Sequence, residues 1–332
     1  MTAPAMIELR DVSRRFAGRV DLADRGARRV RPPTNDGSVR ALDRVNLAVH
    51  EREVVGLVGE SGCGKSTLGR VVARIIEPTE GDVLWNGKSH RDSHATPRER
   101  LAVQMIFQDP YASLNPRMRV ADIVGEAPVV HGLVPSKDRD DYVAETLTRV
   151  GLDSTVLRRF PHQFSGGQRS RIGIARALAV KPRFLVCDEA VAALDVSIQA
   201  QVLNLFIRLR EELALTYLFI SHDLGVIRHL SDRVVVMYLG RIVETGPTAE
   251  VYAKPNHPYT AALIGEVPRI DARHRTYVPI QGEIPSPLAP PTGCHFNPRC
   301  PHAFARCREE APALREIAPG RHSACHLNEN TP

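Results

Sequence analysis

A glycine-rich segment in the first quarter of the chain has the residue types and spacing of a phosphate-binding loop. It matches the pattern G-x-x-x-x-G-K-[ST] and reads Gly59-Glu60-Ser61-Gly62-Cys63-Gly64-Lys65-Ser66. In such a loop the backbone N–H groups curve around a polyphosphate, and the following helix N-terminus adds positive potential. We therefore predict that the loop binds a nucleotide tail, with the Lys65 ammonium on the phosphates and the Ser66 hydroxyl on Mg²⁺.

A second segment pairs an apolar run with two acids. Residues 184–187 are Phe-Leu-Val-Cys, and Asp188 and Glu189 follow directly. After a phosphate loop, such acids are typical of the second motif of a nucleotide-hydrolysing site. We expect Asp188 to hold the Mg²⁺ shell through water and Glu189 to polarise the water that attacks the terminal phosphate.

The elements around these motifs indicate a parallel sheet. Short apolar runs at residues 54–58, 184–187 and 218–220 are separated by amphipathic helical patterns, which favours parallel strands covered by helices. Near the N-terminus, apolar and polar residues alternate around Ile7 and again around Leu47, which predicts edge or antiparallel strands. Residues 18–38 between them are polar and read as a long loop.

Composition narrows the class of protein. The chain has 332 residues, of which 43% are hydrophobic and 25% charged, so collagen-like, coiled-coil and wholly disordered classes are excluded. No apolar run approaches the ~20 residues of a membrane span, and the N-terminus does not resemble a signal peptide, so we expect a soluble intracellular protein. The net charge of +6 suits phosphate ligands, nucleic acid or an anionic membrane surface alike.

A third motif is the most discriminating one. Phe164-Ser165-Gly166-Gly167-Gln168 precedes a helical pattern. With this motif in place, the chain resembles an ATP-binding cassette (ABC) ATPase over residues 6–250. The resemblance implies an α/β fold of the P-loop NTPase type, with a mainly parallel core sheet flanked by helices, an antiparallel β subdomain and an inserted helical subdomain at about residues 112–163.

The resemblance also implies roles for individual residues. Catalysis would fall to Lys65, Gln108, Glu189 and His222, with Gln108 sensing Mg²⁺ and coupling the site to the helical subdomain. Mg²⁺ would be held by Ser66, Gln108 and Asp188. Phe16 would stack on adenine, unless it is a core aromatic. The ATP contacts implied are Phe16, Gly59, Glu60, Ser61, Gly62, Cys63, Gly64, Lys65, Ser66, Thr67, Gln108, Ser165, Gly166, Gly167, Gln168 and Asp195.

In this family two cassettes act together. The resemblance implies that Ser165, Gly166 and Gly167 close over ATP held by the phosphate loop of the opposite cassette, with Asp195 at the contact between the two. A helix N-terminus supplied by the second chain stabilises charge only when the γ-phosphate is present. Dimerisation would thereby depend on hydrolysis.

The last part of the chain, residues 251–332, resembles the C-terminal extension of oligopeptide and dipeptide importer ATPases. The resemblance rests on Asn256-His257-Pro258-Tyr259-Thr260 and on later Pro- and Cys-containing segments. It implies a second-type ATPase subunit at the cytoplasmic face of the membrane, paired with a paralogous ATPase, two permease subunits and, indirectly, a solute-binding protein. Nickel or another small solute stays open as cargo. Because ten prolines lie between Pro247 and Pro298, we expect an irregular extension.

Four of the six cysteines lie in this extension, at Cys294, Cys300, Cys307 and Cys325. Four thiolates can ligate a [4Fe–4S] cluster or a tetrahedral zinc ion. Some importer ATPases of this type carry an iron–sulfur cluster at such cysteines, so the resemblance favours the cluster over zinc and over unligated thiols.

One rival class stays open, a nucleic-acid-handling cassette ATPase, because the chain is basic. Such relatives generally have two cassettes in one chain or long coiled-coil insertions, and neither is visible in the sequence. We therefore expect no nucleic-acid partner.

Overall fold

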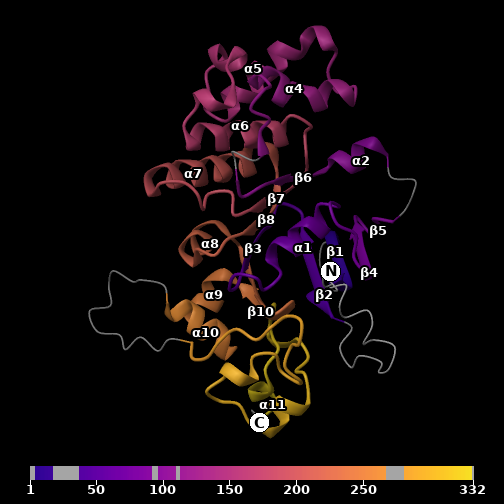
Figure 1. Ribbon diagram of the computed structural model, residues 1–332, viewed down its shortest axis with the longest axis vertical. Helices are drawn as coiled ribbons and strands as arrows, with labels where there is room; N and C mark the ends of the chain where they lie inside the picture. The colour runs from indigo at the N-terminus through magenta and orange to yellow at the C-terminus, as the bar shows by residue number, and fades with distance from the viewer. Residues whose placement is uncertain (1–3, 18–36, 92–95, 110–112, 267–279, 331–332) are drawn as a thin grey trace, which may run out of the picture.

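The computed structural model describes residues 4–17, 37–91, 96–109, 113–266 and 280–330. Within these ranges the strands form two sheets, one with order β2-β1-β4-β5 and one with order β11-β12-β10-β9-β3-β8-β7-β6. Figure 1 shows three tiers: a helical lobe at the top, the sheets with their covering helices in the middle, and the C-terminal extension at the bottom.

The larger sheet is parallel through its centre. β6, β7, β8, β3 and β9 run parallel, whereas β9, β10, β12 and β11 are antiparallel to one another in turn. Its strands are β3 (Val54–Val58), β6 (Val103–Ile106), β7 (Phe184–Asp188), β8 (Thr216–Ile220), β9 (Arg233–Tyr238), β10 (Arg241–Pro247), β11 (Arg315–Ala318) and β12 (Arg321–Ser323). The predicted parallel core is confirmed.

The smaller sheet is antiparallel, as expected from the alternating N-terminal pattern. It comprises β1 (Ala5–Ala17), β2 (Ser38–His50), β4 (Glu80–Trp85) and β5 (Lys88–Ser89). β1 pairs with both β2 and β4, so it is an inner strand and β2 lies at the edge. Residues 18–36, most of the predicted polar loop, lie outside the described part of the chain.

Helices cover both faces of the larger sheet. The helices of the described residues, including those of the helical lobe and of the C-terminal extension, are α1 (Lys65–Val72), α2 (Pro97–Leu101), α4 (Val120–Val130), α5 (Arg139–Arg149), α6 (Gly166–Leu178), α7 (Val196–Leu213), α8 (Leu224–Leu230), α9 (Thr248–Ala253), α10 (Pro258–Gly265) and α11 (Ala305–Glu309). In the described ranges, no helix is long and apolar enough to cross a bilayer. Between β6 and β7, the chain builds the helical lobe from α4 and α5, which fall within the predicted range of about 112–163, and from α6, which follows that range.

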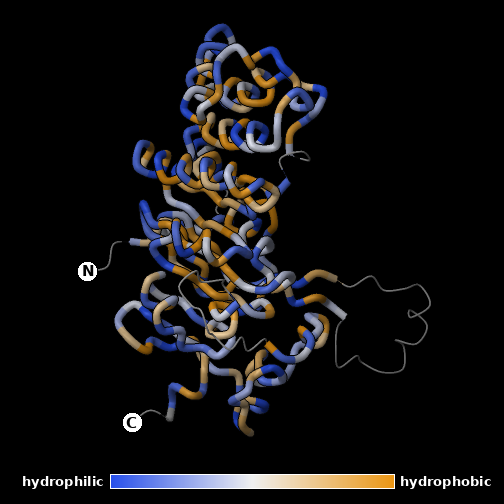
Figure 2. The backbone as a smooth tube through the Cα atoms, turned by 90° about the vertical axis from the view of Figure 1, so that its left-hand side faces the viewer, coloured by the Kyte–Doolittle hydropathy of each residue, from blue (hydrophilic) through white to orange (hydrophobic). Residues whose placement is uncertain are grey.

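Two hydrophobic cores lie on opposite faces of the larger sheet, because successive strand residues point to opposite faces. Leu185 and Cys187 belong to the core with α6 and α7, while Phe184 and Val186 belong to the core with α1 and the smaller sheet. Figure 2 shows hydrophobic segments concentrated along the middle of the molecule. The central strands β3, β7 and β8 are accordingly buried at every position, as strands covered on both faces require.

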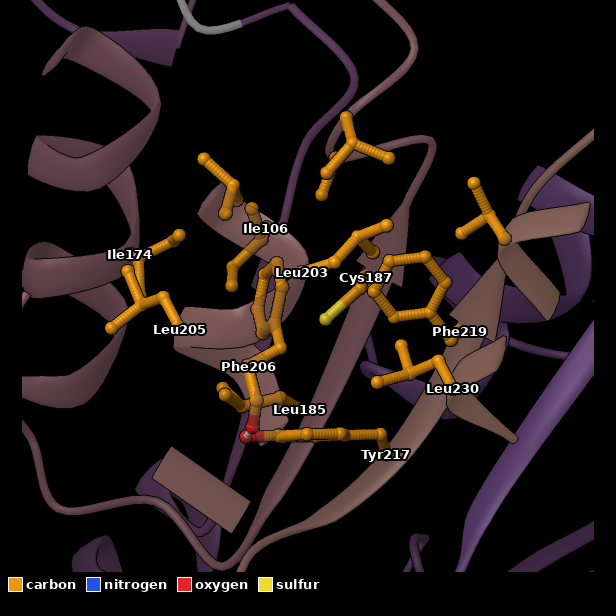
Figure 3. Close-up of a cluster of buried hydrophobic side chains, with 14 of the residues drawn as sticks. Ile106, Ile174, Leu185, Cys187, Leu203, Leu205, Phe206, Tyr217, Phe219 and Leu230 are labelled. Atoms are coloured by element: carbon orange, nitrogen blue, oxygen red, sulfur yellow. Dashed lines mark hydrogen bonds between the residues drawn. The ribbon is translucent and has the colours of Figure 1, made fainter. Parts of the chain in front are cut away.

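Aromatic packing joins α7 to β8 in the first of these cores. The Phe206 ring meets Tyr217 and Phe219 edge-on, with ring centroids 5.8 and 5.5 Å apart (Figure 3). The buried Tyr217 hydroxyl donates to the Phe206 carbonyl at 3.0 Å, so its polar end is satisfied. This packing holds the strands whose ends carry the nucleotide motifs.

The C-terminal extension is more regular than its prolines suggest. Pro258 is the first residue of α10, a position where the missing N–H costs nothing. β12 pairs with β10 and β11 pairs with β12, so the extension prolongs the larger sheet. The expectation of an irregular segment is wrong for these elements, since local composition does not reveal a strand whose partner is about 80 residues earlier in the chain.

Candidate nucleotide-binding and hydrolysis site

The predicted phosphate loop connects β3 to α1. Gly59 has φ +150° and Gly64 φ +109°, backbone conformations that favour glycine. A Cβ atom would stand 2.2 Å from the Met237 carbonyl oxygen at Gly59, and 2.3 Å from the Ala41 carbonyl oxygen at Gly64. The glycines therefore let neighbouring backbone pack tightly against the loop and fix its curve.

The Lys65 ammonium is held inside this curve. Its side chain is buried, and Nζ donates to the carbonyl oxygens of Gly59 at 2.7 Å and Glu60 at 3.0 Å. A buried cation needs such partners, because burial without them is costly. The positive charge thus lies at the centre of the loop.

Ser66 and Asp188 meet although they are far apart in the sequence. The Ser66 hydroxyl donates to Asp188 Oδ1 at 3.0 Å. Burial raises the pKa of the Asp188 carboxyl above its ordinary value; the Ser66 hydrogen bond opposes this rise, and the neighbouring Glu189 carboxylate adds to it. A hydroxyl beside a carboxylate is the oxygen donor set that suits Mg²⁺, so these residues fit the ion that the motif implies.

Three further polar side chains converge beyond the adjacent strand ends. Gln108 follows β6, Glu189 follows β7 and His222 follows β8. Gln108 Nε2 donates to Glu189 Oε2 at 2.6 Å, and His222 Nδ1 lies 3.4 Å from Glu189 Oε1. Because β3, β8, β7 and β6 are consecutive neighbours, the phosphate loop and these residues leave the same sheet edge. Ligands of open α/β sheets bind at such carboxyl ends.

Glu189 lies at a sharp turn after β7. Its φ of +49° is unusual for a residue with a side chain, and its backbone N–H donates to the Ile220 carbonyl at 3.0 Å. This places the carboxylate between the side chains that follow the two neighbouring strands. In this position it can accept a proton from a water at the phosphate end.

Ser165 begins α6 at a distance from this edge. It is the N-cap residue, and its hydroxyl accepts from the Gln168 N–H while the Gln168 side chain accepts from the Ser165 N–H. A Cβ at Gly167 would stand 2.4 Å from Ile198 Cγ2, so glycine allows α6 to approach α7. Figure 1 places α6 beneath α4 and α5 and away from α1. The motif and the phosphate loop of this chain are therefore not brought together.

The structure keeps Asp195 and Phe16 outside this group as well. Asp195 is the exposed N-cap residue of α7 and makes no side-chain cap bond, next to the 84% exposed Val196. The half-buried Phe16 ring, in β1, has the Arg14 guanidinium 4.7 Å from its centroid. A cation on one face leaves the ring able to stack through the other. The roles assigned to both residues stay predictions.

Sequence reasoning missed two residues that contact the phosphate loop. Arg299 forms an ion pair with Glu60, and the Tyr259 hydroxyl accepts from the Glu60 N–H at 2.8 Å. Both lie in the C-terminal extension, whose sequence indicates a family resemblance and a cysteine cluster but no contact with the phosphate loop. Nothing local signals these contacts, since Arg299 is 239 positions from Glu60.

The four clustered cysteines line one small pocket together with His326. None of them is in a disulfide. Burial raises the pKa of the Cys294 thiol to about 11, and the three other cysteines add smaller contributions in the same direction. Among the described residues, however, no three His, Cys, Asp or Glu side chains are grouped closely enough to hold a metal ion. The prediction of an iron–sulfur cluster is therefore not supported by a ready-made ligand set.

Comparisons with known proteins agree with this geometry. Residues 42–192 match the family "ABC transporter", and residues 243–307 match the family "Oligopeptide/dipeptide transporter, C-terminal region". The "Oligopeptide transport ATP-binding protein AppF" of Bacillus subtilis is 47% identical over 97% of this chain and 97% of its own length. The "Dipeptide transport ATP-binding protein DppF" of Haemophilus influenzae is 46% identical over 86% and 89%.

Solved structures show the same fold. The ATP-binding cassette MJ0796 in a dimeric post-hydrolysis state bound to ADP and Pi has a TM-score of 0.61 and 26% identity, covering 73% of this chain and 99% of that chain. CbiO1 of Clostridium perfringens, part of an ABC transporter complex, has a TM-score of 0.61 at 25% identity, covering 76% and 92%. The fold class predicted from the sequence is confirmed. The chain is an ATPase that belongs to the ABC transporter family, in its group of oligopeptide and dipeptide transport ATP-binding proteins.

Proposed function

We propose that this chain hydrolyses ATP to power an importer of oligopeptides or dipeptides. The observation that carries the proposal is the convergence of Gln108, Glu189 and His222 at the sheet edge that also bears the phosphate loop. The match of the C-terminal region and the printed names of the relatives support peptides as cargo. Nickel or another small solute is the other outcome of an uptake test.

Each group at the sheet edge has one task in the proposed reaction. The Lys65 ammonium and the loop N–H groups bind the phosphates, and the helix α1 directs its N-terminus towards them. Ser66, Asp188 and Gln108 would hold Mg²⁺, and the bound ion would supply neutralisation of charge on the phosphate oxygens. Glu189 orients the attacking water and accepts its proton, while His222 positions that water. Gln108 senses whether Mg²⁺ and the γ-phosphate are bound and couples the nucleotide site to the helical lobe.

The proposal is tested by Glu189→Gln in the assembled transporter. The amide keeps the size of the side chain and can still meet Gln108, but it cannot accept the proton. We expect ATP binding to be retained and ATP turnover to fall by about 10²- to 10³-fold, as for loss of a general base. Glu211→Gln, an exposed change on α7, is the matched control. Full turnover in the Glu189→Gln variant would remove Glu189 from this role.

The partner expected here is a paralogous ATPase under two permease subunits, at the cytoplasmic face of the membrane. Support comes from the N-terminus of α6, where Ser165, Gly166 and Gly167 lie away from the phosphate loop of their own chain, as expected for residues that act on the loop of another. Copurification in mild detergent should recover two permeases and a paralogous ATPase. A homodimer of this chain, closing on ATP in the Glu189→Gln background, would replace the heterodimer.

We also propose that Cys294, Cys300, Cys307 and Cys325 hold a [4Fe–4S] cluster. Support comes from the pocket that all four line. Zinc bound by the same four thiolates is the other metal outcome of the test. Anaerobic purification followed by absorption spectra and iron and sulfide analysis tests the proposal, with Cys187→Ser as a control. Absence of iron and sulfide would leave four free thiols.

A further inference from the structure

A buried ion pair ties the C-terminal extension to the phosphate loop. Arg299 Nη1 lies 2.7 Å from Glu60 Oε2, and Arg299 Nη2 lies 2.9 Å from Glu60 Oε1. The Arg299 side chain is 5% exposed and the Glu60 side chain 20% exposed. A guanidinium that meets a carboxylate through two parallel hydrogen bonds is fixed in orientation as well as paired in charge. The ion pair is therefore a geometrically specific contact between the C-terminal extension and the phosphate loop, rather than a surface contact.

Glu60 is held at each of its polar groups. Its side chain is bound by Arg299, its N–H donates to the Tyr259 hydroxyl at 2.8 Å, and its carbonyl accepts from the Lys65 ammonium at 3.0 Å. Two of these three partners belong to the C-terminal extension. The path of the phosphate loop at its second residue is thus set by residues outside the cassette.

Arg299 is itself held rigidly. It ends the short 3-10 turn Asn297–Arg299, and its guanidinium carbon lies 5.8 Å from the centre of the Tyr238 ring. Tyr238 packs against Tyr259 and Phe296, with ring centroids 4.7 and 5.3 Å apart. The aromatic cluster leaves the guanidinium few alternative positions, which is what a group that orients another residue needs.

The Arg299–Glu60 ion pair also affects the electrostatic potential at the phosphate loop, where ATP would bind. A carboxylate within a loop that wraps a polyphosphate opposes the positive potential that the Lys65 ammonium and the loop N–H groups provide. Arg299 neutralises that carboxylate and keeps it turned towards the extension. Without Arg299, Glu60 would remain beside the phosphate site as an unpaired negative charge.

We propose that Arg299 is a positioning residue of the nucleotide site: by holding and neutralising Glu60, it preserves the backbone and the positive field of the phosphate loop for the triphosphate of ATP. The C-terminal extension then contributes to ATP affinity, whereas the groups of the hydrolytic step stay within the cassette. The inference rests on the ATPase activity and not on the identity of the cargo.

The test is a double-mutant cycle in the full chain, assembled with its partners. We expect Arg299→Ala to raise KM for ATP about tenfold, within the usual range of coupling between contacting sites, with kcat changed less than about twofold. Adding Glu60→Gln should return KM close to that of the Glu60→Gln single variant, because the uncompensated charge is gone. Arg299→Lys, which keeps the charge but loses the paired geometry, should lie in between.

Two further measurements separate positioning from simple anchoring of the extension. Arg306→Ala removes a half-buried arginine that pairs with Glu310 and Glu329 within the same extension, and it should leave KM unchanged. If Arg299→Ala fails to fold, Arg299→Lys with and without Glu60→Gln gives the same comparison. An unchanged KM in Arg299→Ala, or a raised KM that Glu60→Gln does not lower, overturns the proposal and leaves Arg299 as an anchor.

Discussion

The nucleotide site and the C-terminal extension gather distant residues in different ways. At the nucleotide site, each functional side chain follows one of four neighbouring parallel strands, so the backbone topology brings them together. In the extension, a turn, short helices and a two-strand addition to the sheet are held by side chains such as Glu244, Arg299 and Tyr259. The first arrangement follows from sheet order, and the second depends on individual contacts.

The two regions also treat buried charge differently. Asp188 is buried beside another acid, and this raises the pKa of its carboxyl. Glu244, on β10 where the C-terminal extension packs against this strand, is completely buried but paired with residues of the extension: it accepts from the Asn256 and His257 N–H groups at 2.9 and 2.8 Å and lies 3.3 Å from Arg321. The buried charge of Asp188 is unfavourable for folding and is explained by its role at the nucleotide site. The buried charge of Glu244 is satisfied by its partners and is explained by its structural role. Three experiments test that contrast.

The largest effect is expected for Asp188→Asn. Activity should fall about 10³-fold, as when a charge-stabilising group of phosphoryl transfer is lost. Stability should change in the opposite direction. A carboxyl whose pKa is raised on folding disfavours the folded state at pH values above its unfolded pKa, so removing the charge should raise Tm at neutral pH. Thermal unfolding without nucleotide measures this, and a lower Tm than that of the natural chain would contradict the contrast.

Glu244→Ala, in contrast to Asp188→Asn, should lower the stability of the folded chain. It leaves Arg321 buried without its partner and two backbone N–H groups unsatisfied, so we expect a loss of about 3–5 kcal/mol in the free energy of unfolding. Urea unfolding and limited proteolysis of the extension measure the loss, with the exposed Glu250→Ala on α9 as control. If ATP affinity also falls, the extension supports the phosphate loop as Arg299 suggests; unchanged stability would show that Glu244 is not an anchor.

The smallest effect concerns pH. Burial lowers the pKa of His257 to about 4 from 6.5, and its neutral Nδ1 accepts from the Tyr259 N–H to cap α10. Between these values the unfolded chain binds a proton that the folded chain does not, so stability falls as pH falls. His257 should account for a loss of about 2 kcal/mol between about pH 7.5 and about pH 5. His257→Asn keeps a capping acceptor, and its Tm should depend less on pH; an equal dependence would exclude His257 as the cause.

The motifs of the nucleotide site could be predicted from the amino-acid sequence, because they are local. The glycine pattern indicates a phosphate-binding loop. The apolar strand followed by Asp188 and Glu189 indicates Mg²⁺ binding and hydrolysis. Neither prediction needs to know which other residues lie nearby in the fold. The alternation of apolar strands with helical patterns was likewise enough to predict the parallel sheet. Helix and strand periodicity arise from local geometry, which a linear sequence records.

Contacts between residues that are far apart in the sequence could not be predicted and are visible in the folded chain alone. The meeting of Gln108 and His222 at Glu189 depends on strand order, the addition of β12 to β10 depends on a pairing across about 80 residues, and the contact of Arg299 with Glu60 spans 239 positions. Each is a side-chain or ladder contact whose partner leaves no trace in the nearby sequence. Long-range contacts are set by how the layers pack, and packing depends on the whole chain at once.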